Sequence, residues 1–142
     1  YVPTPEPIIK RMLELAEVKP RETLYDLGSG DGRILVITAR DFGARAIGVE
    51  IDRSLVAASI QRLRAEKLED RTRVIEGNFF ETDLRDADVV TLYLRQDTND
   101  RLSEKFKKEL KLGVRVVSYI FTMTGWVPTK VDKDSRVYVY TM

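Results

Sequence analysis

Three glycines at alternate positions, Gly28, Gly30 and Gly32, mark the stretch of this chain with the clearest chemical potential. An apolar run over 23–27 precedes them and an amphipathic run over 33–40 follows. This order is typical of a buried strand, a tight turn and a helix. Glycine lets the backbone approach a ligand closely, and the amides that begin the next helix face the same space. The spacing therefore predicts a ligand-binding turn.

Two carboxylates near this turn indicate the kind of ligand. The spacing G-x-G-x-G differs from the dinucleotide fingerprint G-x-G-x-x-G, and Asp26 stands just before the first glycine. A carboxylate repels a pyrophosphate, so Asp26 favours a ligand with a positive part. A second apolar run ends at Glu50, whose carboxylate can accept both hydroxyls of a ribose. S-adenosylmethionine carries an ammonium, a sulfonium and no phosphate, and meets both requirements.

The turn and the two carboxylates together resemble motif I and the following acidic position of the class I S-adenosylmethionine-dependent methyltransferases. The alternative is a glycine-rich turn between a strand and a helix that binds no ligand. The glycine turn, the carboxylate before it and the acid after the second strand agree in order and spacing, which favours the cofactor.

A further candidate group, Asn78, Phe79 and Phe80, follows a third apolar run over 73–76. Ligands of open parallel sheets collect at the carboxyl ends of the strands, so this group is expected beside the adenine. Asn78 can bond the adenine amine and Phe79 can pack on its ring. The alternative is an asparagine in a turn with two core aromatics. We favour the ligand role for Asn78 and Phe79, and a core position for Phe80.

The reacting group is expected at the end of a fourth apolar run, 87–94. Methyl transfer from a sulfonium is an in-line displacement that needs a nucleophile about 3 Å from the methyl and no covalent intermediate. Methyltransferases that act on amide or adenine nitrogen carry an Asp/Asn-Pro-Pro-aromatic motif here, which Leu92-Tyr93-Leu94 lacks. No cluster of Asp or Asn ligands stands at this point, so we expect no metal.

The residues left near this end are aromatic: Tyr93, Phe121, Trp126 and Tyr1. Such a slot suits the aliphatic stem of a lysine, and its rings favour an ammonium at the entrance. Burial beside a sulfonium lowers the pKa of the amine and favours the neutral nucleophile, which Tyr93 can orient. The alternative, that each aromatic residue is core or rim packing, stays open for each of them.

The composition limits the other possibilities. A chain of 142 residues with 43% hydrophobic and 33% charged residues is expected to form one globular domain. It has no cysteine and no histidine, which excludes disulfides and nucleophiles or bases of either type. A net charge of +1 gives no reason to expect nucleic acid. No apolar run has membrane-spanning length and no signal peptide is seen, so we expect a cytoplasmic protein. Because the chain begins at Tyr1, we also expect that N-terminal residues precede it.

The elements that must position these residues alternate between helix and strand, which predicts an α/β fold with a largely parallel sheet. Thr4 is expected to cap a first helix that ends before Pro20, and Asn99 or Asp100 to cap a later one that Gly113 stops. Gly43 and Asp52 are expected at the end and the start of two other helices. The expected segments are strands at 23–27, 46–50, 73–76, 87–94 and 114–121, a crossover helix at 34–42, and a closing antiparallel pair at 125–131 and 137–141.

Over its whole length the chain is similar to the archaeal broad-specificity protein lysine methyltransferases. It is similar also to the mitochondrial enzymes that methylate a lysine of the ATP synthase c subunit. The arm Tyr1-Val2-Pro3-Thr4-Pro5 and the Gly125-Trp126-x-Pro128 strand narrow the resemblance from the superfamily to this group. The other shared segments are 25–33, 48–50, 77–81 and 115–118.

The resemblance implies a Rossmann-like class I fold, with a seven-stranded, mostly parallel sheet and helices on both faces, in one domain over 1–142. Residues 1–20 then form an arm and helix over the cofactor. This arm is either a cap packed on the sheet or a lid across the cofactor, with nothing to decide between them. The implied protein is a monomer that uses S-adenosylmethionine, releases S-adenosylhomocysteine and methylates lysines of several proteins, chromatin proteins included.

The resemblance also carries roles onto residues. An active-site role falls on Tyr1 and Thr4, beside the aromatic candidates above. A departure is that non-SET histone methyltransferases have an Asn-rich block after strand four, which 91–94 lacks. Which group holds the lysine therefore stays open. The candidate cofactor site consists of Tyr1, Thr4, Asp26, Leu27, Gly28, Ser29, Gly30, Glu50, Ile51, Asn78, Phe79 and Phe80.

Alternatives to a lysine methyltransferase are an RNA or small-molecule methyltransferase on the same core and a module that binds the cofactor without catalysis. Methyltransferases of small molecules usually need extra helices or a lid domain to enclose their substrate. This chain has no sequence left for such a lid after the last expected strand, so an open site for a protein substrate is favoured.

Overall fold

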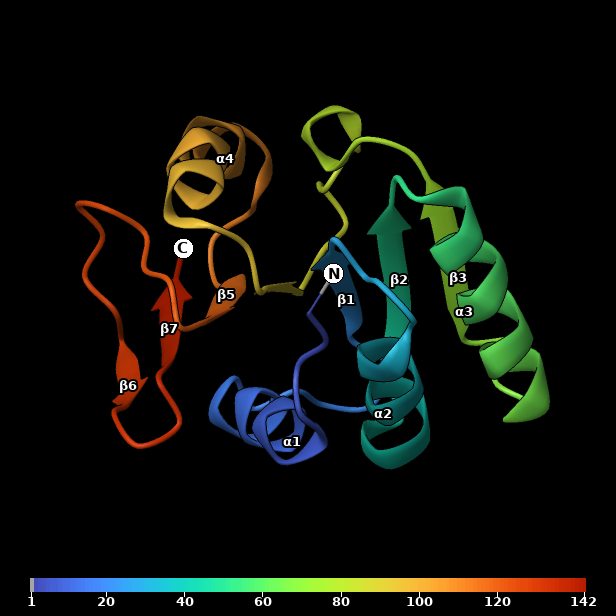
Figure 1. The fold of residues 1–142 in the computed structure, drawn as a ribbon. Coiled ribbons are helices and arrows are strands. Elements are labelled where there is room, and N and C mark those ends of the chain that lie inside the picture. The colour runs from blue at the N-terminus through green and yellow to red at the C-terminus, as the bar shows by residue number, and fades with distance from the viewer. Residues whose placement is uncertain (1) are drawn as a thin grey trace.

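Twelve regular elements make up the computed structural model, which describes residues 2–142 (Figure 1). They are α1 (Glu6–Leu15), β1 (Thr23–Leu27), α2 (Arg33–Phe42), β2 (Arg45–Glu50), α3 (Arg53–Ala65), β3 (Thr72–Glu76), the 3₁₀ helix η1 (Phe79–Glu81), β4 (Val89–Leu92), α4 (Gln96–Glu109), β5 (Arg115–Tyr119), β6 (Lys130–Asp132) and β7 (Val137–Thr141).

The strands form one sheet in the order β3-β2-β1-β4-β5-β7-β6. The five strands from β3 to β5 are parallel, and β7 pairs antiparallel with both β5 and β6. The expected parallel sheet with an antiparallel closing pair is thus confirmed. The strand order reverses between β1 and β4, and a crevice opens at the carboxyl ends of the strands at such a point.

Alternate residues of the central strands face opposite layers, because successive side chains of a strand point to opposite faces. Leu24 and Val89 pack in a cluster with residues of α1 and α2. Their neighbours Tyr25 and Val90 pack in a cluster with Leu102 and other residues of α4. Figure 1 shows α1, α2 and α3 on one side of the sheet and α4 on the other. The expected helices on both faces are confirmed.

The two faces are covered unequally. Between β3 and β4 the chain forms only the short η1, and between β5 and β6 it forms an irregular segment. Within the described residues, α4 is therefore the single α-helix on its side of the sheet (Figure 1). Tyr140 of β7 and Phe106 of α4 are both fully buried in this layer, so side chains fill the core that one helix covers.

Several helix ends lie where the sequence predicts them. Gly43 ends α2 in the left-handed conformation, with a φ of +67°. Asp52 caps α3, and its carboxylate accepts bonds from the amides of Ser54 and Leu55. The first strand occupies 23–27 as expected, whereas the fourth and fifth strands are shorter than the apolar runs that predict them.

Two predicted helix starts are wrong. Pro5, not Thr4, occupies the capping position of α1, and no side chain caps this helix. Thr4 is instead buried in the arm before it. Helix α4 begins at Gln96, ahead of Asn99 and Asp100. Asn99 is fully buried and donates to Ser118 Oγ at 3.3 Å, so its polarity serves a contact with β5 and not a cap. The same helix ends at Glu109, before Gly113.

None of the helices formed by residues 2–142 combines the length and the apolar character that crossing a membrane requires.

Close packing at Gly48 leads to a stability prediction. A Cβ added there would lie 2.5 Å from Ser29 Oγ and 2.8 Å from Leu35 Cδ1. Both neighbours are buried, so Gly48→Ala is expected to lower the free energy of unfolding by about 1–3 kcal/mol through overpacking. Urea denaturation measures this change. Gly77→Ala is the matched control, because its added Cβ meets only Ile75 Cγ2 at 3.9 Å. Equal stability of the two variants would contradict the prediction.

Candidate active site

A pocket of about 440 Å³ lies where the strand order reverses, at the carboxyl ends of β1 and β4. We refer to it as the central pocket. Its lining comes from the N-terminal arm, the glycine turn, the ends of β1 and β2, the segment around the start of α4 and the segment after β5. The lining residues are Val2, Thr4, Asp26, Gly28, Ser29, Arg33, Ile34, Glu50, Tyr93, Leu94, Arg95, Thr98 and Phe121.

A smaller hollow of about 230 Å³ adjoins the central pocket, and we refer to it as the side pocket. The two share Gly28 and Glu50, so they form one continuous depression across the ends of β1 and β2. The side pocket is lined by Gly28, Val49, Glu50, Ile51, Gly77, Asn78, Phe79, Phe80 and Arg101.

The glycine turn is fixed onto the end of β2. The amides of Gly28 and Ser29 both donate to the carbonyl of Val49, at 2.8 and 3.0 Å. Gly28 has a φ of +79°, which side chains disfavour, and a Cβ there would approach Leu94 Cδ2 at 3.1 Å. A side chain at this position would also intrude between the two pockets. The turn thus keeps a smooth floor for a ligand that extends across both.

Glu50 ties the glycine turn to the start of α3. One carboxylate oxygen accepts from the Gly30 amide at 2.8 Å, and the other accepts from the Asp52 amide at 2.9 Å. The residue is 9% exposed, and what remains exposed faces the pockets. Each oxygen has a second acceptor position. Glu50 can therefore hold the turn and accept hydroxyl groups of a ligand at the same time.

Asp26 places a second carboxylate under the same pocket. It is 3% exposed and accepts one hydrogen bond within the described structure, from Thr91 Oγ1 at 2.8 Å. Burial is the main cause that raises the pKa of Asp26 to about 7; the charges of Glu50 and Asp31 add to the rise, and the Thr91 hydroxyl opposes it. A cation brought next to Asp26 would relieve this cost. The carboxylates of Asp26 and Glu50 therefore fit a ligand with a positive group.

The N-terminal arm contacts the glycine turn through an arginine. Arg33 forms an ion pair with Asp31, with Nη2 at 2.7 Å from Oδ2, and its Nη1 donates to the Thr4 carbonyl at 3.4 Å. Thr4 is 5% exposed and lines the central pocket together with Val2. The arm is thus a wall of the pocket. Tyr1, which the sequence also predicts here, lies outside the described residues.

The segment after β3 combines a turn role with a place in the side pocket. Asn78 Oδ1 accepts from the Phe80 amide at 2.9 Å and so caps η1. Phe79 and Phe80 are half-buried with ring centroids 5.0 Å apart, and both line the side pocket. Arg101 of α4 reaches over the Phe80 ring at 4.3 Å from its centroid. Phe80 is therefore at once part of the core cluster and of the pocket wall.

Two of the predicted aromatic residues, Tyr93 and Phe121, meet at the central pocket. Tyr119 packs against Tyr93 with ring centroids 4.7 Å apart. Trp126 does not join them. Its Nε1 donates to Ser103 Oγ at 3.0 Å, and its ring packs edge-on against Tyr140.

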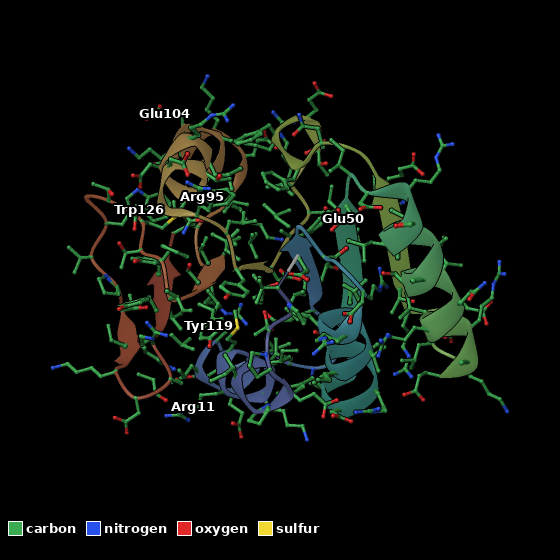
Figure 2. All side chains as sticks on the ribbon, viewed as in Figure 1. Arg11, Glu50, Arg95, Glu104, Tyr119 and Trp126 are labelled. Carbon is green, nitrogen blue, oxygen red and sulfur yellow. The ribbon has the colours of Figure 1, made fainter. Side chains whose placement is uncertain are left out.

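Trp126 lies away from the central pocket because of the path that the chain takes after β5. The strand stops at Tyr119, and the following segment runs along α4 toward β6. This path carries Trp126 past the pocket, and Figure 2 shows it beside α4, on the side away from Glu50. Trp126 instead packs in the core against Phe106 and Tyr140, where its ring fills space and its Nε1 has a hydrogen-bond partner.

Among the predicted cofactor residues that the structure describes, Leu27 and Gly30 line neither pocket, and Ile51 lines only the side pocket. The Leu27 side chain is fully buried in the core cluster beneath the sheet end. Gly30 takes part through its amide, which bonds Glu50. Ile51 is 72% exposed at the rim of the side pocket. The ligand-binding roles of all the predicted residues stay predictions.

Several lining residues escaped sequence analysis. Arg95 and Thr98 line the central pocket and Arg101 the side pocket, all from the same face at the start of α4. Their three-residue spacing is the signal that could have found them. The late start predicted for this helix concealed it. Thr91, the partner of Asp26, is a hydroxyl in an otherwise apolar strand, which is also a readable signal.

No group of three or more acidic side chains capable of holding a metal ion occurs within the part of the chain that the structure describes.

Comparison with known proteins places these features in a family. Residues 26–130 match the model of the ANTKMT methyltransferase domain. A protein-lysine N-methyltransferase of Saccharolobus islandicus is 42% identical over 149 aligned positions, covering 100% of this chain and 92% of its own length. The mouse adenine nucleotide translocase lysine N-methyltransferase is 34% identical, and the match covers 93% of this chain but 58% of that protein.

The fold comparison agrees. A crystal structure of a protein from Salinibacter ruber, described as an RNA methyltransferase in complex with S-adenosylhomocysteine, has a TM-score of 0.96 and 44% identity. The match covers 99% of this chain and 93% of that one. The C-terminal domain of a precorrin-6Y methyltransferase from Rhodobacter capsulatus shares the fold, with a TM-score of 0.78 at 18% identity.

The fold is thus the Rossmann-like fold of the S-adenosylmethionine-dependent methyltransferases, as the sequence predicts. The chain belongs to the ANTKMT methyltransferase domain family, since the family model and the archaeal relative match it over most or all of its length.

The buried Asp26 leads to a pH prediction. Its pKa is about 7 in the folded protein against 3.8 as the ordinary value, so the folded state holds the proton more tightly. The protein therefore loses stability as the pH rises from about 4 to about 7, and Asp26→Asn removes this loss. We expect the variant to unfold at higher urea than wild type at pH 8 and at nearly the same urea at pH 4. A variant less stable at pH 8 would contradict the prediction.

Proposed function

We propose that this chain transfers methyl groups from S-adenosylmethionine to the side-chain amines of lysines on other folded proteins, and that several proteins, small chromatin proteins among them, are its substrates. The observation that carries the proposal is the division of the central pocket. Carboxylates line one end of it, at Asp26 and Glu50, and aromatic side chains line the other, at Tyr93 and Phe121.

The relatives support lysine as the acceptor. The archaeal relative is a protein-lysine N-methyltransferase by name, and the mouse relative is a lysine N-methyltransferase of adenine nucleotide translocase. A relative from Xenopus laevis, 28% identical, is a lysine N-methyltransferase that acts on the ATP synthase. The mouse and Xenopus relatives are named for different substrates, yet each of the three matches covers nearly the whole of this chain. A shared reaction with varied protein partners is the simplest account.

The carboxylate end of the pocket fits S-adenosylmethionine, which when bound supplies an electrophilic methyl group. Asp26 gains a cationic partner for its buried carboxylate, and Glu50 can accept the ribose hydroxyls while still holding the glycine turn. The side pocket continues from Glu50 to Phe79, whose ring offers a stacking surface for the base. Both interactions come from this chain's own residues.

The aromatic end fits the lysine. The lysine stem is apolar and packs on rings, and the ring faces attract its ammonium at the entrance. Exclusion of water between Tyr93 and Phe121 lowers the pKa of the amine and favours the neutral form that can attack the methyl group. The hydroxyls of Tyr93 and Thr98 are the groups that can orient this amine.

The open side of the fold supports a protein as substrate. On the side of the sheet next to the aromatic end of the pocket, α4 is the single α-helix in the described part of the chain. The described segments after α4 add strands to the sheet and no further helix, so a lysine that projects from a folded protein can reach the pocket.

RNA methylation is the second candidate, because the structure from Salinibacter ruber with 44% identity is described as an RNA methyltransferase. The same aromatic end can stack a base. A net charge of +1 and the absence of the proline motif after the fourth strand weigh against it.

A labelling experiment tests the proposal. The protein is incubated with S-adenosylmethionine carrying a tritiated methyl group and either a protein extract or total RNA. We expect label in the protein fraction, in methyl-lysine after acid hydrolysis, and none in RNA. Label in RNA alone would contradict lysine methylation. Binding of S-adenosylhomocysteine in a calorimeter with no label in either fraction would indicate a binding module without catalysis.

A second prediction concerns the ribose. Glu50→Ala removes an ionised acceptor and the tie to the glycine turn, so the affinity for S-adenosylhomocysteine is expected to fall about tenfold to a hundredfold. Isothermal titration calorimetry measures it. Glu76→Ala is the matched control, because Glu76 is the register partner of Glu50 on β3 and lies outside both pockets. Unchanged affinity in Glu50→Ala would mean that other groups hold the ribose.

A further inference from the structure

A one-residue turn follows β5 at the aromatic end of the central pocket. The Phe121 amide donates to the Tyr119 carbonyl at 2.9 Å, so Ile120 forms the whole turn. Ile120 has a φ of +70°, which β-branched side chains rarely adopt. A three-residue turn with positive φ at its centre is rare and strained. Such strain persists only where the surroundings fix the backbone, and it clusters at functional sites.

Side chains of α4 fix the backbone beyond this turn. The Gln96 carboxamide pairs with Thr122 in both directions, since its Nε2 donates to the Thr122 carbonyl at 2.8 Å and its Oε1 accepts from the Thr122 amide at 3.3 Å. Asp100 accepts from the Thr124 amide at 3.1 Å. Side chains of α4 therefore supply backbone bonds to this segment at Thr122 and Thr124, and Tyr140 of β7 supplies another, since its hydroxyl accepts from the Met123 amide at 3.0 Å.

Ser118 holds the turn from the side of the sheet. Its hydroxyl donates to the Phe121 carbonyl and accepts from Asn99 Nδ2 at 3.3 Å. Ser118 and Asn99 are both fully buried. The backbone of Phe121 is thus clamped between β5 and α4, and its ring position is set by residues that do not themselves line the central pocket.

The Phe121 ring stands between two hollows. It lines the central pocket, and it also lines an outer hollow of about 630 Å³ formed by Arg95, Gln96, Asp97 and Phe121. Arg95 and Phe121 belong to both linings, so they mark the boundary at which a passage from the outer hollow into the central pocket would run. Figure 2 shows Arg95 beside α4, and Tyr119 on the other side of the sheet end from this helix.

We propose that the acceptor side chain enters through the outer hollow and that Phe121, held by the Ile120 turn, is the residue that selects a side chain of lysine length. Ser118 is a positioning residue that acts through Phe121. This inference rests on the proposed lysine methylation. A fixed ring at the passage sets how far an unbranched alkyl amine must extend to reach the pocket. A ring free to shift would accept shorter and longer amines alike.

The test uses one short peptide in three forms, with ornithine, lysine or homolysine at the acceptor position. These side chains differ by one methylene each. We expect wild type to prefer lysine over both by about tenfold or more in kcat/KM, the discrimination that an apolar wall gives for one methylene. Phe121→Ala is expected to reduce this preference to within about threefold, mainly through KM.

Ser118→Ala is expected to reduce the preference in the same way, and Ser118→Thr, which keeps the hydroxyl, to restore it. If Ser118 acts through Phe121, the double variant loses no more selectivity than Phe121→Ala alone. Glu104→Gln is the matched control on α4, because Glu104 is exposed and far along the helix from the passage (Figure 2). It is expected to keep the wild-type preference.

The outcomes separate this inference from the proposed function. Lysine peptides methylated with unaltered length selectivity in Phe121→Ala would overturn the inference and leave lysine methylation standing. Absence of methylation of every peptide and protein by wild type, with label in RNA, would overturn both. If Ser118→Ala unfolds, Phe121→Ala and Ser118→Thr still decide, since the former removes the ring and the latter keeps the clamp.

Discussion

The bonds from Glu50 to the amides of Gly30 and Asp52 organise the ligand-binding half of this molecule. They join the end of β2 to the turn after β1 and to the start of α3, so one side chain aligns three elements at the sheet edge. The Glu50 carboxylate accepts from both amides, and hydrogen bonds of this charge-assisted kind are the stronger ones. Its charge then raises the pKa of Asp26 beneath the same pocket. The two carboxylates at this end of the central pocket therefore favour a ligand with a positive group.

The ligand-binding half could be predicted well from the sequence because its signals are local. The glycine turn, the acid before it and the acid after the second strand all follow short apolar runs of strand length. The parallel arrangement of those strands then brings them together by topology alone. The two roles of Glu50 and of Asn78 could not be predicted from the sequence. Each side chain bonds the backbone of a turn and also lines a pocket.

The aromatic end of the central pocket was predicted less well because its geometry depends on contacts between distant segments. Asn99 has the residue type of a helix cap, but it is buried against Ser118 of β5, nineteen positions along the chain. Trp126 has the residue type of a binding-site aromatic, but the segment after β5 follows α4 and takes it into the core. Neither outcome follows from periodicity. The position of Asn99 follows from a helix that begins earlier than its apolar residues indicate, and that of Trp126 from the path of the chain after β5.

Family membership and the structure complement each other here. The family model and the relatives define a methyltransferase, while the geometry distinguishes a carboxylate end from an aromatic end within one pocket. The names of the relatives say nothing about the wall of the pocket at the start of α4. Arg95, Thr98 and Phe121, which lies in the segment after β5, form this wall.

The unequal covering of the sheet has a consequence for how the protein responds to heat. The carboxylate end is supported by α2, α3 and three parallel strands, whereas the wall at Phe121 depends on the first turn of α4 and on a segment without strand pairing. Local opening begins where backbone bonds are fewest and most exposed. On warming, the wall at Phe121 would therefore open while the carboxylate end of the pocket keeps its structure. Selectivity for the acceptor would then be lost at a lower temperature than the fold.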